Sequence, residues 1–239
     1  EVEAALAKEN QRLAFEPMNH CGVMGRQGEP TIGGVFAANV SGPRRINVGA
    51  ARDFLLGVRY VDGRGVVVKN GGRVMKNVTG YDLVKLMSGS FGTLGVLSEV
   101  SLKVLPVPEM QKTLVIDTQG CAQAVAAMSD ALGSPYEVSG AAYVNGKTYL
   151  RLEGFEAAVS ERFGKLQDAL KAYGDSDGID GESAAQLWAG IRDVNGLAER
   201  NFVAKTSLRP SAQPALQAAL AERFEVQAQL DWGGGLAWI

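Results

Sequence analysis

Thr31-Ile32-Gly33-Gly34 opens a glycine-rich stretch of sequence that continues to Gly95. Sixteen of the 30 glycines in the chain fall between Gly22 and Gly95. Glycine is needed where the backbone takes a positive φ or lies directly against a ligand. The later blocks of the stretch are Gly42-Pro43-Arg44-Arg45, Arg52-Asp53, Gly71-Gly72-Arg73, Lys76-Asn77-Val78-Thr79-Gly80-Tyr81-Asp82 and Gly89-Ser90-Phe91-Gly92-Thr93-Leu94-Gly95-Val96. The concentration of these blocks predicts a cofactor bed rather than a series of ordinary turns.

Composition narrows the class of protein. The chain has 239 residues, of which 46% are hydrophobic and 21% are charged, and its formal net charge is −2. Such a chain can bury a real core, but it has no basic stripe for nucleic acid and no apolar run of about 20 residues for a membrane span. Cys21 and Cys121 lie far apart, which argues against a metal knuckle or a disulfide framework. We therefore expect a globular protein of a reduced, cytoplasmic compartment.

The sequence divides near Pro106. Before it, Phe54 to Val61 and Val66 to Val68 are apolar runs joined by the hairpin signal Asp62-Gly63, and Ser98 to Leu105 alternates like a strand. Helical spacing appears from Tyr81 to Met87. Both ends resemble cuts, because the chain opens at Glu1 in a helical pattern and stops after a strand-like segment, so we expect an internal fragment.

The second half has a different texture. Its patterns predict strand, helix, strand, strand and helix in succession, with a turn at Asn145-Gly146, and this order indicates a ferredoxin-like α+β unit. The predicted elements are Lys112 to Thr118, Cys121 to Leu132, Val138 to Val144, Thr148 to Leu152 and the apolar helix from Phe155 to Tyr173. Beyond them we expect a strand from Phe202 to Ser207, a helix from Gln213 to Arg223 capped by Ser211, and a strand from Val226 to Leu230.

An acidic segment interrupts this half. Gly174 to Gly181 carries Asp175, Asp177 and Asp180 at a spacing that resembles a calcium loop. The bidentate Glu that closes such a loop is absent, so a solvated turn is expected.

The glycine-rich stretch has a chemical rationale of its own. The pyrophosphate of a dinucleotide is best held by backbone N–H groups that only glycine lets approach closely. Thr31-Ile32-Gly33-Gly34, followed by Ala37-Ala38-Asn39, supplies such a strip, although the dipeptide alone would more simply be a tight turn. No Gly-x-Gly-x-x-Gly follows a strand, and no Gly-Lys-Ser or Gly-Lys-Thr closes the run at Gly89, so neither a Rossmann site nor a nucleoside triphosphate site is supported.

The order of the blocks resembles the vanillyl-alcohol-oxidase-type FAD family, also called PCMH-type. Within that family the chain is most similar to the FAD-binding subunits of bacterial glycolate oxidase complexes. The similarity is strong from Leu6 to about Pro108 and returns weakly at Asp231 to Trp238. It is carried by Thr31 to Gly34, Gly42 to Arg45, Val48 to Gly57, Gly72 to Leu83 and Leu94 to Glu99.

This resemblance implies an α+β architecture with residues 1–108 as an N-terminally truncated FAD-binding domain and residues 109–239 as a truncated cap. The second flavin subdomain would be present and the first missing. Thr31, Gly33 and Gly34 would line the pyrophosphate, Asn39 and Gly42 would lie beside the ribityl and isoalloxazine, and Gly49 with Asp53 would close the pocket wall. The backbone of Gly95 and Val96 would touch the adenosine end.

Several side chains allow two interpretations. Arg44, Arg45 and Arg52 could each hold a phosphate or a substrate carboxylate, and an Arg–Asp pair is the structural alternative. Lys76 and Tyr81 could tune flavin reduction, while Lys76 could instead neutralise a helix C-terminus or a phosphate.

The histidine and the tryptophans have structural alternatives too. Relatives with a doubly tethered flavin carry the linking histidine in the missing loop, so we expect His20 and Cys21 to be structural and the FAD to be non-covalent. Trp188, Trp232 and Trp238 are expected in the cap core.

The resemblance further implies a flavin-dependent oxidoreductase that acts on 2-hydroxy acids, as a subunit that oxidises glycolate to glyoxylate with electron transfer through FAD. Oxidation needs a base, and the cap contains no histidine. We therefore expect an electron-relay subunit whose partners are a companion flavoprotein subunit and an iron–sulfur subunit. Those partners would bring it to the inner face of the cytoplasmic membrane. The alternatives are a self-sufficient FAD-dependent D-lactate or 2-hydroxy-acid dehydrogenase, and a flavin-free scaffold of the same fold.

Overall fold

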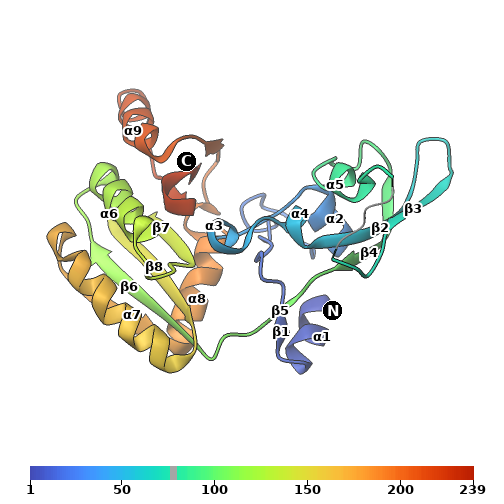
Figure 1. The fold of residues 1–239 in the computed structure, drawn as a ribbon. Coiled ribbons are helices and arrows are strands. Elements are labelled where there is room, and N and C mark those ends of the chain that lie inside the picture. The colour runs from blue at the N-terminus through green and yellow to red at the C-terminus, as the bar shows by residue number, and fades with distance from the viewer. Residues whose placement is uncertain (76–79) are drawn as a thin grey trace. The chain divides into compact units, whose positions relative to one another are not determined.

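In the computed structural model, which describes residues 1–75 and 80–239, the chain forms two units that each contain a sheet of their own (Figure 1). Unit 1 comprises Glu1–Asn19, Gly28–Gly42 and Val48–Val107. Unit 2 comprises His20–Gln27, Pro43–Asn47 and Pro108–Ile239. Two short segments from the first half of the sequence therefore join the second half, and this exchange has no local signal in the sequence.

A three-stranded antiparallel sheet of order β3-β2-β4 is the centre of unit 1. Its elements are α1 (Val2–Lys8), β1 (Gln11–Arg12), α2 (Ile32–Ala37), α4 (Ala51–Phe54), β2 (Leu55–Val61), β3 (Val67–Gly71), α5 (Leu83–Met87), β4 (Val96–Leu102) and β5 (Leu105–Pro106), with β1 paired to β5. Phe15 is fully buried and packs against the rings of Phe36 and Phe54, with centroids 5.5 and 5.3 Å away. These aromatic contacts join α2 and α4 to the core of the unit.

The hairpin predicted at Asp62-Gly63 is present. β2 and β3 pair from Gly57↔Gly71 to Val61↔Val67, which leaves the turn between them. Both backbone N–H groups of Arg64 and Val66 donate to Asp62 Oδ1, at 2.9 and 3.0 Å. These bonds to the charged carboxylate hold the pKa of Asp62 below its ordinary value.

Unit 2 contains the predicted ferredoxin-like arrangement. In sequence order its elements are β6 (Met110–Asp117), α6 (Cys121–Gly133), β7 (Gly140–Val144), β8 (Lys147–Gly154), α7 (Glu156–Ala169), η1 (Lys171–Tyr173) and β9 (Ser176–Asp180). The four strands are all antiparallel, in the order β7-β8-β6-β9. The sequence prediction of a ferredoxin-like α+β unit is thus confirmed.

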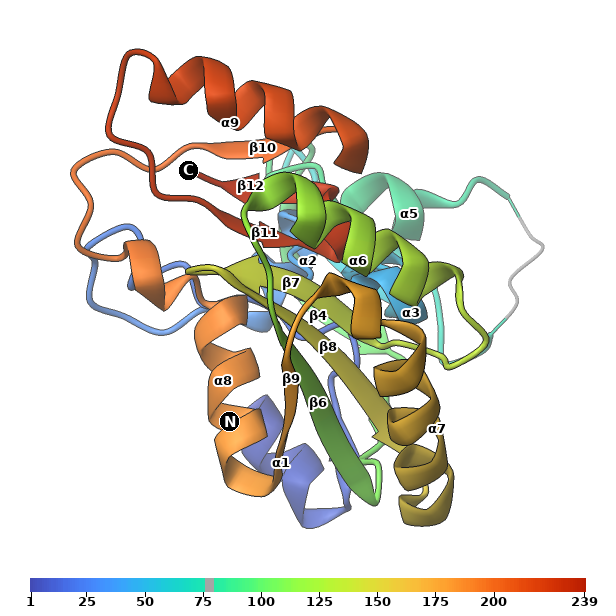
Figure 2. The ribbon, with the colours of Figure 1, turned by 90° about the vertical axis from the view of Figure 1, so that its left-hand side faces the viewer.

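Helices cover both faces of this sheet. Leu114 and Ile116 of β6 are fully buried in a core shared with α6 and α7, whereas Thr113, the residue before Leu114, accepts a 2.8 Å hydrogen bond from the indole Nε1 of Trp188. Alternate residues of a strand point to opposite faces. Trp188 lies on α8 (Gly181–Arg192), so α8 covers the face opposite α6 and α7 (Figure 2).

Three further strands extend the sheet beyond β7 to seven strands, in the order β10-β12-β11-β7. The remaining elements are α3 (Arg45–Val48), η2 (Asn195–Leu197), β10 (Lys205–Ser207), η3 (Pro210–Ala212), α9 (Gln213–Ala221), β11 (Gln229–Asp231), η4 (Trp232–Gly234) and β12 (Leu236–Trp238). Ala212 is the N-cap residue of α9. Ser211, which was predicted to cap this helix, lies inside η3 instead. No described helix is both long and apolar enough to span a bilayer.

The acidic segment differs from its prediction as a solvated turn. Ser176–Asp180 forms the edge strand β9 and pairs with β6 from Ile116↔Ser176 to Lys112↔Asp180. The three aspartates suggested a turn because aspartate is rare in most strands. An edge strand is an exception, because charged side chains keep its exposed edge from pairing with other chains. Among the described residues no acidic, His or Cys cluster has the geometry of a metal site.

A buried ion-pair network ties the segment Pro43–Asn47 to the sheet of unit 2. Arg44 Nε donates to Glu153 Oε2 at 2.7 Å, and Arg44 Nη2 donates to Glu153 Oε1 at 2.9 Å. Arg151 Nε lies 3.6 Å from Glu153 Oε2 and donates to Ser139 Oγ. All three charged side chains are almost completely buried, at 7%, 6% and 0% exposure. Glu153 is therefore the shared counter-ion of two buried guanidinium groups.

Glu153→Ala should destabilise the protein strongly, because it removes the carboxylate that the two buried guanidinium groups of Arg44 and Arg151 share. Breaking a buried pair in this way costs about 3–5 kcal/mol. Urea unfolding followed by tryptophan fluorescence measures the loss. Glu161→Ala is the matched control, because its pair with Lys165 is exposed and should matter little. Equal destabilisation by the two variants would contradict the structural role of the network.

Candidate functional site

Most of the predicted site residues lie in unit 1, around α2 and the segment between α2 and β2. The exceptions are Arg45, which belongs to unit 2, and Lys76, which lies outside the described residues. The unit 1 members are Thr31, Gly33, Gly34, Asn39, Gly42, Gly49, Asp53, Tyr81, Gly95 and Val96.

Thr31 begins α2. Its backbone is extended, and its Oγ1 accepts a hydrogen bond from the Gly34 N–H at 3.1 Å. This is an N-cap, which satisfies one of the free N–H groups of the first turn. A Cβ on Gly34 would lie 3.1 Å from the same Oγ1. Glycine at position 34 is thus partly explained by the space that the capping oxygen of Thr31 needs.

Gly33 has no such explanation. It is not among the glycines with a positive φ, and a Cβ there would meet only Leu97 at 3.8 and 3.9 Å, which is ordinary contact. A glycine inside a helix costs about 1 kcal/mol relative to alanine. Neither the backbone nor the packing of unit 1 requires this residue to be glycine. Close approach of a ligand to α2 would supply the missing reason.

Other glycines of the stretch serve the protein itself. Gly95 has a φ of +154°, and a Cβ on it would lie 2.5 Å from the carbonyl oxygen of Val61. A Cβ on Gly71 would lie 2.3 Å from the Leu56 oxygen. Both residues let strands of the small sheet pass close to one another. The glycine-rich stretch therefore contains glycines that the packing of the sheet requires, such as Gly71 and Gly95, and glycines that it does not require, such as Gly33.

The segment from Asn39 to Asp53 is held by its own polar side chains. Asn39 Oδ1 accepts from the Arg52 N–H at 2.9 Å, and Ser41 Oγ accepts from the Ala51 N–H at 2.9 Å. Asp53 Oδ2 accepts from the Ala50 N–H at 2.9 Å. Three consecutive N–H groups at the start of α4 are thereby satisfied within the protein. Asn39 and Asp53 shape this segment, and Arg52 is exposed and not paired with Asp53 by any ion pair of the described chain.

Three predicted residues have simple positions. Gly42 is buried and its N–H donates to the Phe15 oxygen at 2.9 Å. Gly49 has a φ of +95°, and a Cβ there would lie 2.8 Å from Asp53 Oδ2. Val96 opens β4 with 71% of its surface exposed.

A cavity of about 130 Å³ lies in unit 1 beside Asp53 and Tyr81. It is also lined by Leu55, Leu56, Gly71, Val74, Met75, Gly80, Asp82, Val84 and Lys85. Tyr81 is 87% exposed, and Lys85 Nζ donates to the Leu55 oxygen at 3.2 Å. Ligand pockets normally hold about 300–1,000 Å³. This cavity is therefore smaller than an ordinary ligand pocket.

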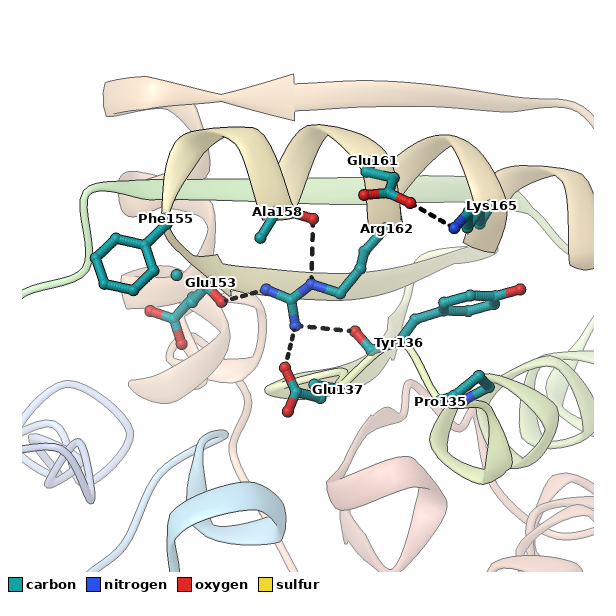
Figure 3. Close-up of a pocket in the computed structure, with 10 residues that line it drawn as sticks. Pro135, Tyr136, Glu137, Glu153, Phe155, Ala158, Glu161, Arg162 and Lys165 are labelled. Carbon is teal, nitrogen blue, oxygen red and sulfur yellow. Dashed lines mark hydrogen bonds and ion pairs between the residues drawn. The ribbon is translucent and has the colours of Figure 1, made fainter.

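A larger groove, of about 540 Å³, lies in unit 2 between α7 and the segment before β7 (Figure 3). Arg162 crosses it, with Phe155 at one end and Lys165 at the other. Its guanidinium donates to the backbone carbonyl oxygens of Ala158, Tyr136 and Glu153, at 3.2, 3.3 and 2.9 Å. It also donates to the side-chain Oε2 of Glu137 at 2.6 Å. Protein groups therefore occupy the donors of Arg162, and the groove is a structural junction.

The sequence analysis missed the position of His20. Residues 109–239 contain no histidine, yet His20–Gln27 belongs to unit 2 and the His20 ring lies edge-on to Trp238, with centroids 6.4 Å apart. Trp238 and Trp188 are buried at 8% and 2% exposure, as core tryptophans should be. A long-range contact of this kind leaves no pattern in the local sequence.

Gly33→Ala and Gly95→Ala should separate the two kinds of glycine. Alanine at position 33 has room and should leave stability unchanged or raise it by up to about 1 kcal/mol. Alanine at position 95 meets the Val61 carbonyl and an unfavourable φ, which should cost about 1–3 kcal/mol. Thermal unfolding by circular dichroism measures both, and a destabilised Gly33→Ala would mean that packing alone demands the glycine.

Two glycolate oxidase subunits are similar to this chain, one of them along its whole length. Glycolate oxidase subunit GlcE of Escherichia coli (strain K12) is 35% identical over 240 residues, which cover 100% of this chain and 61% of that protein. Glycolate oxidase subunit GlcD of Bacillus subtilis (strain 168) is 34% identical over 125 residues, covering 52% of this chain and 27% of that protein. The chain thus spans less than two thirds of either relative. No protein-family model matches it.

A solved structure of alkyldihydroxyacetonephosphate synthase shares the fold, with a TM-score of 0.70 at 18% identity, and the match covers 99% of this chain and 54% of that one. The predicted α+β fold of the PCMH type is confirmed. The resemblance seen in the sequence is confirmed as well: along its entire length, this chain is similar to a glycolate oxidase subunit.

Proposed function

We propose that the chain belongs to an FAD-binding subunit of a glycolate oxidase, with unit 1 contributing to the flavin site and unit 2 acting as the cap. The observation that carries the proposal is the 35% identity with GlcE, which extends over both units. Gly33 supports it from the structure, because a close ligand is the remaining reason for glycine at that position.

In this proposal the first turn of α2 presents Thr31, Gly33 and Gly34 toward the pyrophosphate of FAD. Bound FAD would itself accept the electrons from the oxidation of a 2-hydroxy acid such as glycolate. The open wall beside Val96 and Tyr81, both largely exposed, would be covered by the cofactor. Asn39, Gly42, Gly49, Asp53 and Gly95 would shape the backbone around the site, and Lys76 would border it.

Gly33→Ala should weaken FAD binding at least tenfold, which corresponds to about 1.4 kcal/mol, because the added methyl group occupies the surface on which the cofactor lies. Quenching of flavin fluorescence on titration with the protein measures the dissociation constant. Gly63→Ala is the matched control, because that glycine lies in the β2–β3 turn with nothing near its Cβ. Unchanged binding by Gly33→Ala would contradict the assignment of α2 to the cofactor.

We further propose that the subunit relays electrons from a companion flavoprotein subunit and passes them to an iron–sulfur subunit, at the inner face of the cytoplasmic membrane. Support comes from the relatives, of which two carry the names of different glycolate oxidase subunits. The second candidate is a self-sufficient dehydrogenase. A D-lactate dehydrogenase of Anaerostipes hadrus, 38% identical over 96 residues, favours it, and His20 in unit 2 provides a candidate base.

Anaerobic addition of glycolate or D-lactate to the isolated, FAD-loaded subunit distinguishes the two candidates. A relay should keep its flavin absorbance until the companion subunit is added. Direct bleaching would establish the self-sufficient dehydrogenase instead, and loss of that bleaching in His20→Gln would then identify the base. A protein that retains no flavin at all would be the scaffold.

A further inference from the structure

The groove beside α7 is built by unit 2 alone (Figure 3). One wall is α7, and the other is the segment of residues 135–137 that precedes β7. Its volume of about 540 Å³ is that of an ordinary ligand pocket. Between Phe155 and Lys165 the helix rises about 15 Å, which matches roughly four or five residues of extended peptide. The groove therefore has the size of a peptide-binding site.

Arg162 makes the groove rigid. Its guanidinium donates to both walls and to β8, at oxygens of Ala158, Tyr136, Glu137 and Glu153. Only 16% of its side chain is exposed, so it forms a floor between the walls. A groove that is fixed in this way exists before a ligand arrives, and a preformed site has less conformational entropy to lose on binding.

Phe155 lies at one end of the groove without a structural reason. It is the N-cap residue of α7 and makes no capping hydrogen bond, although Ser, Thr, Asp or Asn would serve the helix better. Its surface is 73% exposed, so its ring adds little to the core. The carboxylate of Glu109 supplies part of the cap instead, by accepting from the Glu156 N–H at 3.3 Å. Aromatic side chains are enriched in protein interfaces, and such a contact would explain a ring at this position.

Apolar surface continues along the groove from Phe155. Pro135 and Ala158 are exposed, and Tyr136 is half-buried against the core of unit 2. Figure 3 shows Phe155 and Tyr136 on opposite sides of the Arg162 guanidinium. Grooves lined by aromatic side chains are recurrent binding sites for extended, proline-rich segments. The groove can therefore receive the apolar side chains of such a segment.

Carboxylates outnumber cations around the groove. The cations that line it are Arg162 and Lys165, which are paired with Glu137 and Glu161. Two more exposed carboxylates lie at the Phe155 end and form no ion pair within the described chain, those of Glu109 and Glu156. This excess of negative charge favours a ligand that carries positive charge.

We propose that the groove binds an extended segment of a partner protein in which an apolar residue neighbours an arginine or a lysine. The apolar side chain contacts the rings of Phe155 and Tyr136. The cation lies beside the carboxylates of Glu109, Glu137 and Glu156. This proposal requires no flavin and is independent of the proposed function.

Selection from a phage-displayed library of random dodecapeptides on the immobilised protein tests the proposal. We expect the enriched peptides to share an apolar residue, proline or leucine, beside an arginine or a lysine. Fluorescence anisotropy of an enriched peptide then gives its dissociation constant. Phe155→Ser should weaken binding at least tenfold, and yet the protein should be at least as stable to urea, because Ser is a preferred N-cap.

Further variants separate ring and charge. Phe155→Tyr keeps the ring and should retain binding. Glu137→Gln keeps an acceptor for Arg162 but loses the charge, so it should weaken binding severalfold. The matched controls are Phe224→Ala and Glu225→Gln, because both residues are exposed and neither lines the groove. No enrichment of any motif, enrichment of acidic peptides, or unaltered binding by Phe155→Ser would each overturn the proposal.

Discussion

The two-point ion pair between Arg44 and Glu153 is the constraint on which much of unit 2 depends. It joins residues 109 positions apart in the sequence and is almost completely buried. Arg151, with no exposed surface, uses the same carboxylate and lies 4.4 Å from the Trp188 ring. One carboxylate therefore organises a segment of the first half of the chain, the central strand β8 and the packing of α8. Well-packed hydrophobic residues could supply comparable stability at such a position, but they would not form the two directed hydrogen bonds that join Arg44 to Glu153.

Glycine has two distinct uses in unit 1. At Gly71 and Gly95 the strands approach so closely that any side chain would overlap a carbonyl oxygen. At Gly33 the surroundings leave room, and the helix would be more stable with alanine. The first use builds a small three-stranded sheet that can carry loops, and the second leaves bare backbone where α2 faces outward. The proposed cofactor bed needs both, because exposed backbone that contacts a ligand must be carried by a rigid support.

Much of this structure could be predicted from the sequence. Hydrophobic periodicity located the strands and helices of the ferredoxin-like unit, and Asp62-Gly63 and Asn145-Gly146 correctly marked hairpin turns. Local patterns failed where pairing with a distant strand decides the structure, as for β9, whose aspartates suggested a turn. They also could not show that His20 and Arg45 belong to unit 2, because only long-range contacts carry that information. Motifs placed Gly33 and Gly95 in one site, whereas their different roles depend on neighbours such as Leu97 and Val61.

The composition of unit 2 from three separate stretches of chain has a consequence for its folding during synthesis. Arg44 leaves the ribosome 109 residues before Glu153, which at about 5–20 residues per second means a delay of roughly 5–20 s. Throughout that interval the segment around Arg44 has no sheet to join, and closing so long a loop afterwards is slow. The segment around Arg44 thus remains without its sheet partner until β8 (Lys147–Gly154) has been synthesised.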